Sequence, residues 1–180
     1  CHIGCRQSSY LLEFLGTDRE IYAVDNEQIQ LDYLKKRVSQ ENKAKLDKWH
    51  FKNINFPDEL LPDRKYSLII LANILHFFPL EECLKIGGKI VEVTEKGSMI
   101  YIVVHSRKYY LNDPKKPKNN EYFKHYFTIK DLENIFPKDL FEKVYCAEIE
   151  KMDTQSDKEI TNRWLDKSLK ADGITDPAHK

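Results

Sequence analysis

Apolar residues in the first part of the chain fall into short runs separated by polar turns, and their spacing predicts alternating strands and helices. Continuous or β-branched runs of about 4–8 residues are typical of strands, whereas apolar residues spaced three or four apart are typical of helices. The expected strands are Glu20–Asp25, Trp49–Ile54, Tyr66–Asn73 and Met99–His105. The expected helices are Tyr10–Leu15, Ile29–Val38 with a continuation through Gln40–Lys48 left open, and Leu80–Val93.

This alternation favours right-handed βαβ units, which build a parallel sheet with helices on both faces. The near-continuous apolar runs of Tyr66–Asn73 and Met99–His105 predict buried strands, since such strands are covered on both sides. The expected fold class is therefore α/β, with a mostly parallel sheet.

The pattern changes after His105. Thr128 is suited to cap a helix that Pro137 ends, because threonine offers an acceptor to the first amides and proline cannot continue the helix. The segments expected here are a polar loop at Asn112–Asn120, a helix at Ile129–Phe136, a long strand at Leu140–Met152 and a helix at Lys158–Lys170. We expect one domain over residues 1–170 and a flexible tail over residues 171–180.

Composition narrows the class of protein. The chain has 180 residues, of which 41% are hydrophobic and 32% charged, as in a globular domain and not a disordered one. Lys and Arg number 29, as do Asp and Glu, so the chain lacks the basic excess of a nucleic-acid-binding domain, and we do not expect that partner. No apolar run approaches the roughly 20 residues of a membrane helix.

Four cysteines are too few for a disulfide framework, and with no secretory signal in view we expect a cytoplasmic protein. Cys1, His2 and Cys5 lack a fourth ligand and a second ligand pair, so no metal site is predicted. The sequence begins without methionine, almost at its first motif, and we expect it to be part of a longer protein whose first strand is truncated here. Oligomeric state is left open.

Candidate chemistry gathers where the predicted strands end, because open parallel sheets bind ligands beyond their carboxyl ends. Gly4 lies at the first such end and allows backbone to approach a ligand closely. Asp25 follows at the end of the next strand, where a carboxylate can accept hydrogen bonds from the two hydroxyls of a ribose. A turn glycine and a surface aspartate would explain this pair equally well.

Several segments together resemble, in order and spacing, the motifs of class I S-adenosylmethionine-dependent methyltransferases. They are His2–Ser8 (HIGCRQS), Val24-Asp25, Phe51–Ile54 (FKNI) and Tyr66–Phe78 (YSLIILANILHFF). The most specific part is Asn73–His76 (NILH), which is similar to the segment that follows the fourth strand in that family. The resemblance covers about residues 1–105 in motif order and extends more loosely to Met152.

This resemblance implies a Rossmann-like fold, with a mostly parallel sheet of seven strands that includes an antiparallel edge strand. It also implies that the domain binds S-adenosylmethionine and methylates a small-molecule acceptor. The cofactor-binding residues it implies are Gly4, Asp25, Asn26, Asn53, Ile54, Asn73 and Ile74. Asp25 would hold the ribose and Asn53 the adenine amino group, while Ile54 and Ile74 would pack on the adenine ring. His76 is the candidate general base, with a structural role as the alternative, and His105 is a second candidate.

The first loop of that family usually reads acid-x-Gly-x-Gly-x-Gly, and this chain has His2, Gly4, Arg6 and Ser8 at those places. These departures favour an alternative, a catalytically degenerate domain of the same fold that serves as a binding or interaction module. A nicotinamide-dependent Rossmann enzyme is the third hypothesis, since Gly4 and Asp25 also suit it. The basic loop around Lys115, with tyrosines nearby, is expected to be a solvated loop.

Overall fold

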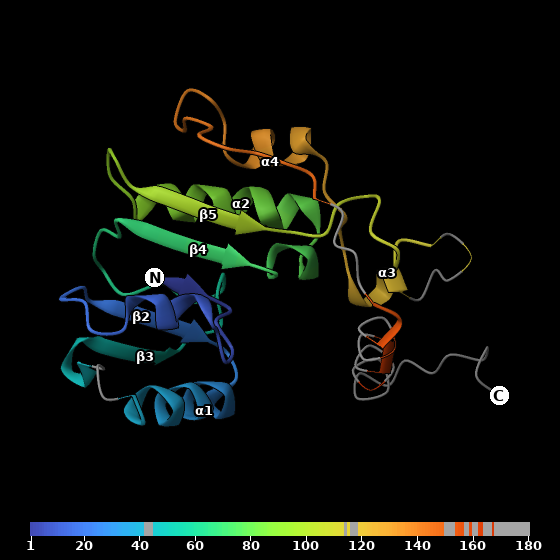
Figure 1. The fold of residues 1–180 in the computed structure, drawn as a ribbon. Coiled ribbons are helices and arrows are strands. Elements are labelled where there is room, and N and C mark those ends of the chain that lie inside the picture. The colour runs from blue at the N-terminus through green and yellow to red at the C-terminus, as the bar shows by residue number, and fades with distance from the viewer. Residues whose placement is uncertain are drawn as a thin grey trace.

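The computed structural model describes residues 1–41, 45–113, 115, 119–149, 154–156, 159, 162–163 and 167. Its core is one sheet of five parallel strands in the order β3-β2-β1-β4-β5, with all arrowheads pointing the same way in Figure 1. The strands are β1 (His2–Ile3), β2 (Ile21–Asp25), β3 (Trp49–Asn53), β4 (Leu68–Ala72) and β5 (Met99–Val103). The α/β, Rossmann-like class predicted from the sequence is confirmed.

The helices are α1 (Gln28–Ser39), α2 (Leu80–Glu92), α3 (Asn119–Tyr122) and α4 (Ile129–Ile135), with short 3₁₀ turns η1 (Tyr10–Phe14), η2 (Leu46–Lys48) and η3 (Leu75–Phe77). The predicted cap is present, because the Thr128 hydroxyl accepts the Asp131 amide while the Asp131 carboxylate accepts the Thr128 amide. This reciprocal pair satisfies two amides that the start of α4 would otherwise leave without partners.

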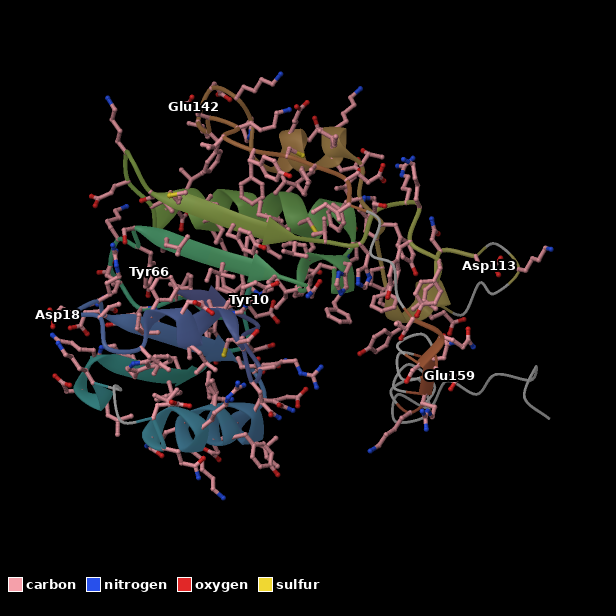
Figure 2. All side chains as sticks on the ribbon, viewed as in Figure 1. Tyr10, Asp18, Tyr66, Asp113, Glu142 and Glu159 are labelled. Carbon is pink, nitrogen blue, oxygen red and sulfur yellow. The ribbon has the colours of Figure 1, made fainter. Side chains whose placement is uncertain are left out.

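Helices cover both faces of the sheet, as predicted. Successive strand residues point to opposite faces, so Tyr22 and Val24 of β2 belong to a core with α2 and α4, whereas Ile21 and Ala23 belong to a core with α1 and η1. Figure 2 shows side chains filling both sides of the sheet. These two cores hold the strand ends in fixed positions.

The strand order reverses between β1 and β4. The chain steps from β1 through β2 to β3 on one side and then returns to place β4 and β5 on the other side of β1. Connections therefore leave the carboxyl ends of β1 and β4 in opposite directions, and such a switch point opens a crevice above the sheet.

Two local predictions were wrong. The segment Leu140–Met152 forms no strand over its described part, which ends at Ile149, and Val144 and Tyr145 are exposed. Alternating apolar residues do not make a strand without a neighbour to accept backbone hydrogen bonds. β5 is an edge strand of the described sheet instead of a buried one, with Met99 62% exposed. The described residues form five parallel strands, so the seven strands and the antiparallel edge strand stay a prediction.

Two helix predictions are changed in detail. The Tyr10–Leu15 segment is a 3₁₀ turn, and α1 ends at Ser39 without continuing to Lys48, because 40–41 and 45 are non-helical and 46–48 form η2. Of the helix predicted at Lys158–Lys170, only 159, 162–163 and 167 are described, and these are helical; the rest, like the tail over 171–180, lies outside the described residues. Within the described chain, no helix has the length and apolar character that crossing a membrane requires.

Candidate functional site

A hollow of about 440 Å³ lies at the switch point, above the carboxyl ends of β1 and β4. We call it the switch-point hollow. Its lining comes from the loop after β1, the end of β4 with η3, and the segments that follow β5: His2, Gly4, Cys5, Arg6, Gln7, Ser8, Ser9, Tyr10, Ala72, Asn73, His76, Phe77, His105, Tyr109 and Phe123. Tyr10, labelled in Figure 2, lies near the carboxyl ends of the central strands.

The loop after β1 follows an unusual backbone path. Gly4 and Arg6 both have left-handed backbone, with φ of +66° and +45°. For arginine this conformation costs roughly 1–2 kcal/mol, and a hydrogen bond holds it, because the Arg6 amide donates to the Asp25 carboxylate at 2.7 Å. The Glu27 amide donates to the other carboxylate oxygen at 3.0 Å. Asp25, only 5% exposed, thereby ties the loop after β1 to the loop after β2.

Gly4 is required for close packing at the base of this loop. A Cβ added to it would lie 2.1 Å from Cδ1 of Ile74, far inside a normal contact distance. The Ile74 side chain therefore fills the space that the glycine leaves, and the end of β4 packs directly on the loop after β1.

His2 and Ser8 form a buried pair at the side of the switch-point hollow. The His2 Nδ1 and the Ser8 Oγ lie 2.8 Å apart, and Ser8 Oγ also accepts the Leu11 amide at 3.4 Å. The other ring nitrogen of His2, Nε2, is buried and has no hydrogen-bond partner among the described residues. The pair joins β1 to η1 and leaves one imidazole nitrogen available.

Another part of the lining consists of four stacked and edge-on rings, which we call the aromatic wall: His76, His105, Tyr109 and Phe123. The rings of His76 and His105 stack with centroids 3.9 Å apart and planes 7° apart, and His105 stacks in the same way on Tyr109, also at 3.9 Å. Phe123 meets the His76 and His105 rings edge-on. Edge-on and stacked contacts of this kind add to the stability that burial provides.

Backbone hydrogen bonds join the aromatic wall to the segment around α3. The His76 carbonyl accepts the Lys124 amide at 2.8 Å, and the His105 carbonyl accepts the Phe127 amide at 2.9 Å. In Figure 1, α3 lies beyond the carboxyl ends of the strands, on the side of the switch-point hollow. The region after β5 therefore closes one side of the hollow.

The three histidines that line the switch-point hollow are uncharged at neutral pH. Burial, with a smaller contribution from neighbouring His105, lowers the pKa of His76 to about 2. Burial also lowers the pKa of His105 and of His2 to about 4 each. The Nδ1 atoms of His76 and His105 are buried without a hydrogen-bond partner in the described structure, so these rings contribute polar atoms but no charge.

The predicted site residues divide into two groups. Gly4, Asn73 and His76 line the switch-point hollow, and Ile74 packs beneath it on Gly4. The others, Asp25, Asn26, Asn53 and Ile54, lie beside one another at the ends of β2 and β3, outside that lining.

Hydrogen bonds connect the second group. The Ile54 amide donates to the Asp25 carbonyl at 3.0 Å, and the Asn53 side chain donates to the same carbonyl at 3.4 Å. Asn26 and Asn53 are exposed. The structure therefore brings these residues together at one rim, next to the loop after β1.

Sequence reasoning missed Tyr109 and Phe123 as parts of the lining. The density of aromatic residues after His105 was the available signal for these two. The spacing of residues did not predict the contact between Arg6 and Asp25, because it is a hydrogen bond between residues 19 positions apart.

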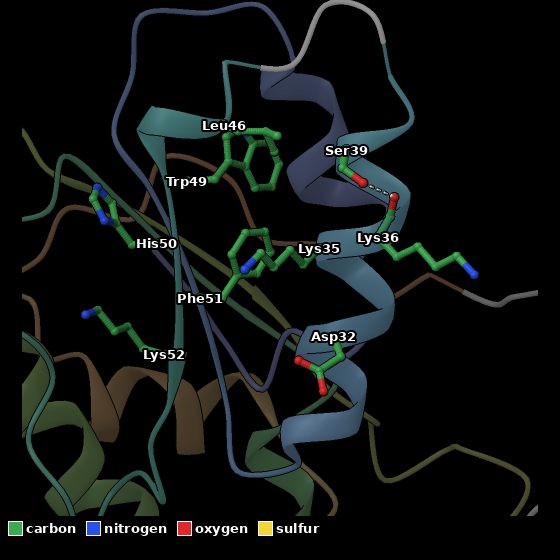
Figure 3. A pocket seen from close by; sticks show the side chains of 9 residues that line it. All are labelled: Asp32, Lys35, Lys36, Ser39, Leu46, Trp49, His50, Phe51 and Lys52. Carbon is green, nitrogen blue, oxygen red and sulfur yellow. Dashed lines mark hydrogen bonds between the residues drawn. The ribbon is translucent and has the colours of Figure 1, made fainter.

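A second hollow, of about 680 Å³, lies between α1 and the edge strand β3 (Figure 3). In Figure 3, Asp32, Lys36 and Ser39 come from α1, while Trp49 and Lys52 come from β3. None of the buried polar atoms without a partner in the described structure belongs to this hollow. It also lies along the side of the sheet instead of at its carboxyl ends, so we assign it no ligand.

Comparisons with known proteins support the fold. No protein-family model matches the chain, and no curated protein matches it in sequence. Among solved structures, a SAM-dependent methyltransferase from Methanosarcina mazei is similar over 86% of this chain and 84% of its own, with a TM-score of 0.64 and 19% identity.

Two further structures are similar over a smaller part. The CcbJ methyltransferase from Streptomyces caelestis matches 59% of this chain with a TM-score of 0.50 and 17% identity. The glycopeptide N-methyltransferase MtfA, solved with S-adenosyl-L-methionine, matches 58% with a TM-score of 0.50 and 12% identity. The chain spans 42% and 46% of these two proteins. It therefore has the Rossmann-like fold that these methyltransferases share.

The residues around the switch-point hollow fit one end of S-adenosylmethionine. A volume of about 440 Å³ lies within the range of ligand pockets, roughly 300–1,000 Å³. The hollow is rich in aromatic rings, which attract a sulfonium cation, and it offers the free His2 Nε2 to a polar group. At the other end, each Asp25 oxygen already accepts an amide, although a carboxylate has about four acceptor positions in all.

Proposed function

We propose that this domain binds S-adenosylmethionine and transfers its methyl group to a small-molecule acceptor. The observation that carries the proposal is the switch-point hollow, which lies at the carboxyl ends of β1 and β4 and is lined by Gly4, Asn73 and His76. The amino-acid end of the cofactor would lie in this hollow, and its adenosine would extend over Asp25, Asn53 and Ile54.

S-adenosylmethionine supplies an activated methyl group on a positively charged sulfur. What the chain would contribute is mainly position and shielding from water, because an in-line displacement needs its reactants held in one geometry. The aromatic wall would exclude water from the methyl group, and Asn73 would hold the cofactor at the end of β4. A low pKa makes His76 a weak base, so it would take a proton only from an atom that methylation makes strongly acidic.

A second candidate function is binding without catalysis. It is favoured by the engaged state of Asp25, whose oxygens both accept amides and whose side chain is almost fully buried. If that carboxylate serves only the fold, the ribose would lose its expected partner, and the domain would be an interaction module.

Isothermal titration with S-adenosylmethionine, S-adenosylhomocysteine and NAD tests these alternatives. We expect saturable binding of the first two ligands and none of NAD. A folded protein that binds neither adenosyl ligand would overturn the proposal and support the interaction module, whereas binding of NAD alone would overturn both. A His50→Gln variant, which changes a residue of β3 outside the switch-point hollow, serves as the control and should bind as the wild type does.

A further inference from the structure

Charge is distributed unevenly around the switch-point hollow. Among its lining residues Arg6 is the one that is charged at neutral pH, since the lining contains no Asp, Glu or Lys and its three histidines are neutral. The Arg6 residue is exposed, and its guanidinium has no ion pair or hydrogen bond with the described residues. A free cation at an otherwise uncharged hollow suits a ligand that carries one anionic group.

Backbone strain points to the same place. Arg6 and Asn73 are the non-glycine residues with left-handed backbone in the described chain, with φ of +45° and +58°, and both line the switch-point hollow. Strained conformations persist only where the surroundings impose them, and they gather at ligand sites. Hydrogen bonds impose both, from the Arg6 amide to Asp25 and from the Asn73 amide to the Val103 carbonyl at 2.8 Å.

The chemistry of the proposed cofactor supplies the matching anion. Its adenosine is uncharged, its sulfur and amino group are positive, and its carboxylate is the one negative group. A guanidinium binds a carboxylate through two parallel hydrogen bonds, which makes the pair both strong and directional.

We propose that Arg6 binds the carboxylate of the cofactor's amino-acid end, and that Asp25 positions Arg6 by holding its backbone. This inference rests on the function proposed above. It assigns Arg6 a role in ligand recognition, and it gives Asp25 a role that acts through another residue.

Two ligands that differ only at the amino-acid end test the proposal. S-adenosylhomocysteine carries the amino acid, whereas 5′-methylthioadenosine has the same adenosine and thioether without it. By titration calorimetry we expect the wild type to bind S-adenosylhomocysteine at least about tenfold more tightly. Arg6→Gln should remove most of this preference and leave the affinity for 5′-methylthioadenosine unchanged. Arg19→Gln, at another exposed arginine outside the hollow, should preserve the preference.

The ratio of the affinities for the two compounds also distinguishes a positioning role of Asp25 from direct binding of the ribose. If Asp25 bound the ribose directly, it would contact both compounds equally. Asp25→Asn would then lower the affinity for both by the same factor and leave the preference intact. A positioning residue for Arg6 would reduce the preference itself, which is the result we expect. Circular dichroism establishes that each variant is folded before the titration.

Three results would overturn the inference. If Arg6→Gln binds S-adenosylhomocysteine as tightly as the wild type or more tightly, the arginine is neutral or obstructive, while the proposed function survives. If the folded wild type binds 5′-methylthioadenosine and S-adenosylhomocysteine equally well, no group recognises the amino-acid end. If it binds neither compound, both the proposed function and this inference fail.

Discussion

Acid should destabilise this domain through the stacked imidazoles of the aromatic wall. Burial holds the pKa of His105 at about 4 and that of His76 at about 2, whereas both rings titrate near 6.5 in an unfolded chain. The unfolded state therefore binds protons first as the pH falls. The contribution of the two neutral imidazoles to stability is complete above pH 6.5, and it is lost as the pH falls from 6.5 toward the pKa values of the folded state.

The size of this effect follows from the separation of pH and pKa. At pH 5 the unfolded imidazole lies 1.5 units below its pKa, and each unit corresponds to about 1.36 kcal/mol, so each ring costs about 2 kcal/mol. The pair together should lower the free energy of unfolding by about 4 kcal/mol between pH 7 and pH 5. This loss is a large share of the free energy of unfolding of a typical domain, which is roughly 5–15 kcal/mol.

Urea denaturation at pH 7 and pH 5, followed by tryptophan fluorescence, measures the loss. Replacing His105 by Phe keeps a flat ring in the stack and removes one titrating group, so the variant should lose about 2 kcal/mol less than the wild type over this interval. His50→Gln, at the partly exposed histidine of β3, is the control for the aromatic wall. The reasoning is refuted if His105→Phe and the wild type lose the same free energy between the two pH values.

Further changes test the packing and the caps. Gly4→Ala should destabilise the fold by about 2 kcal/mol or more, because the new Cβ would lie 2.1 Å from the Ile74 side chain. Gly88→Ala in α2 should stabilise the fold by about 0.5–1 kcal/mol, because its Cβ would meet nothing within 4 Å. Thermal melts compare the two variants. Thr128→Ala should cost about 0.5–2 kcal/mol through loss of the α4 cap, measured by urea denaturation, and a smaller change would show that the cap contributes little. Cys146 is exposed and should react rapidly with a thiol reagent, whereas burial raises the pKa of Cys83 to about 12 and should protect it until unfolding, as absorbance of the released chromophore would show.

Periodicity predicted the elements of the sheet well, because strands and helices that bury one or both faces carry that burial in their sequence. The predicted strand Tyr66–Asn73 contains β4, and the predicted helix Leu80–Val93 contains α2. The same reasoning failed at Leu140–Met152, where apolar residues alternate but the described part pairs with no strand. A strand is a property of two segments, and one segment cannot reveal its partner.

The candidate site was predictable only in its backbone positions. The strand ends bearing Gly4, Asn73 and His76 could be located because parallel strands bring their carboxyl ends to one edge. The aromatic wall could not, since the contact of His76 with His105 joins residues 29 positions apart through tertiary packing. The engagement of Asp25 was equally hidden, because spacing indicates which residues share an edge and not which donors have already reached a carboxylate.

Loss of glycines from the first loop does not by itself mean loss of the loop's shape. Arg6 occupies a place where the methyltransferase motif that the first loop resembles has glycine, yet its backbone is left-handed with φ of +45°, as a glycine there would allow. The Asp25 carboxylate maintains that path against the steric cost of a side chain, so the backbone shape of the loop does not require a glycine here. The difference from the glycine motif is chemical, since position 6 carries a cationic side chain at the rim of the switch-point hollow. Sequence departures at this loop therefore argue for altered recognition, and the case for a non-catalytic module depends on whether the buried Asp25 leaves the ribose a partner.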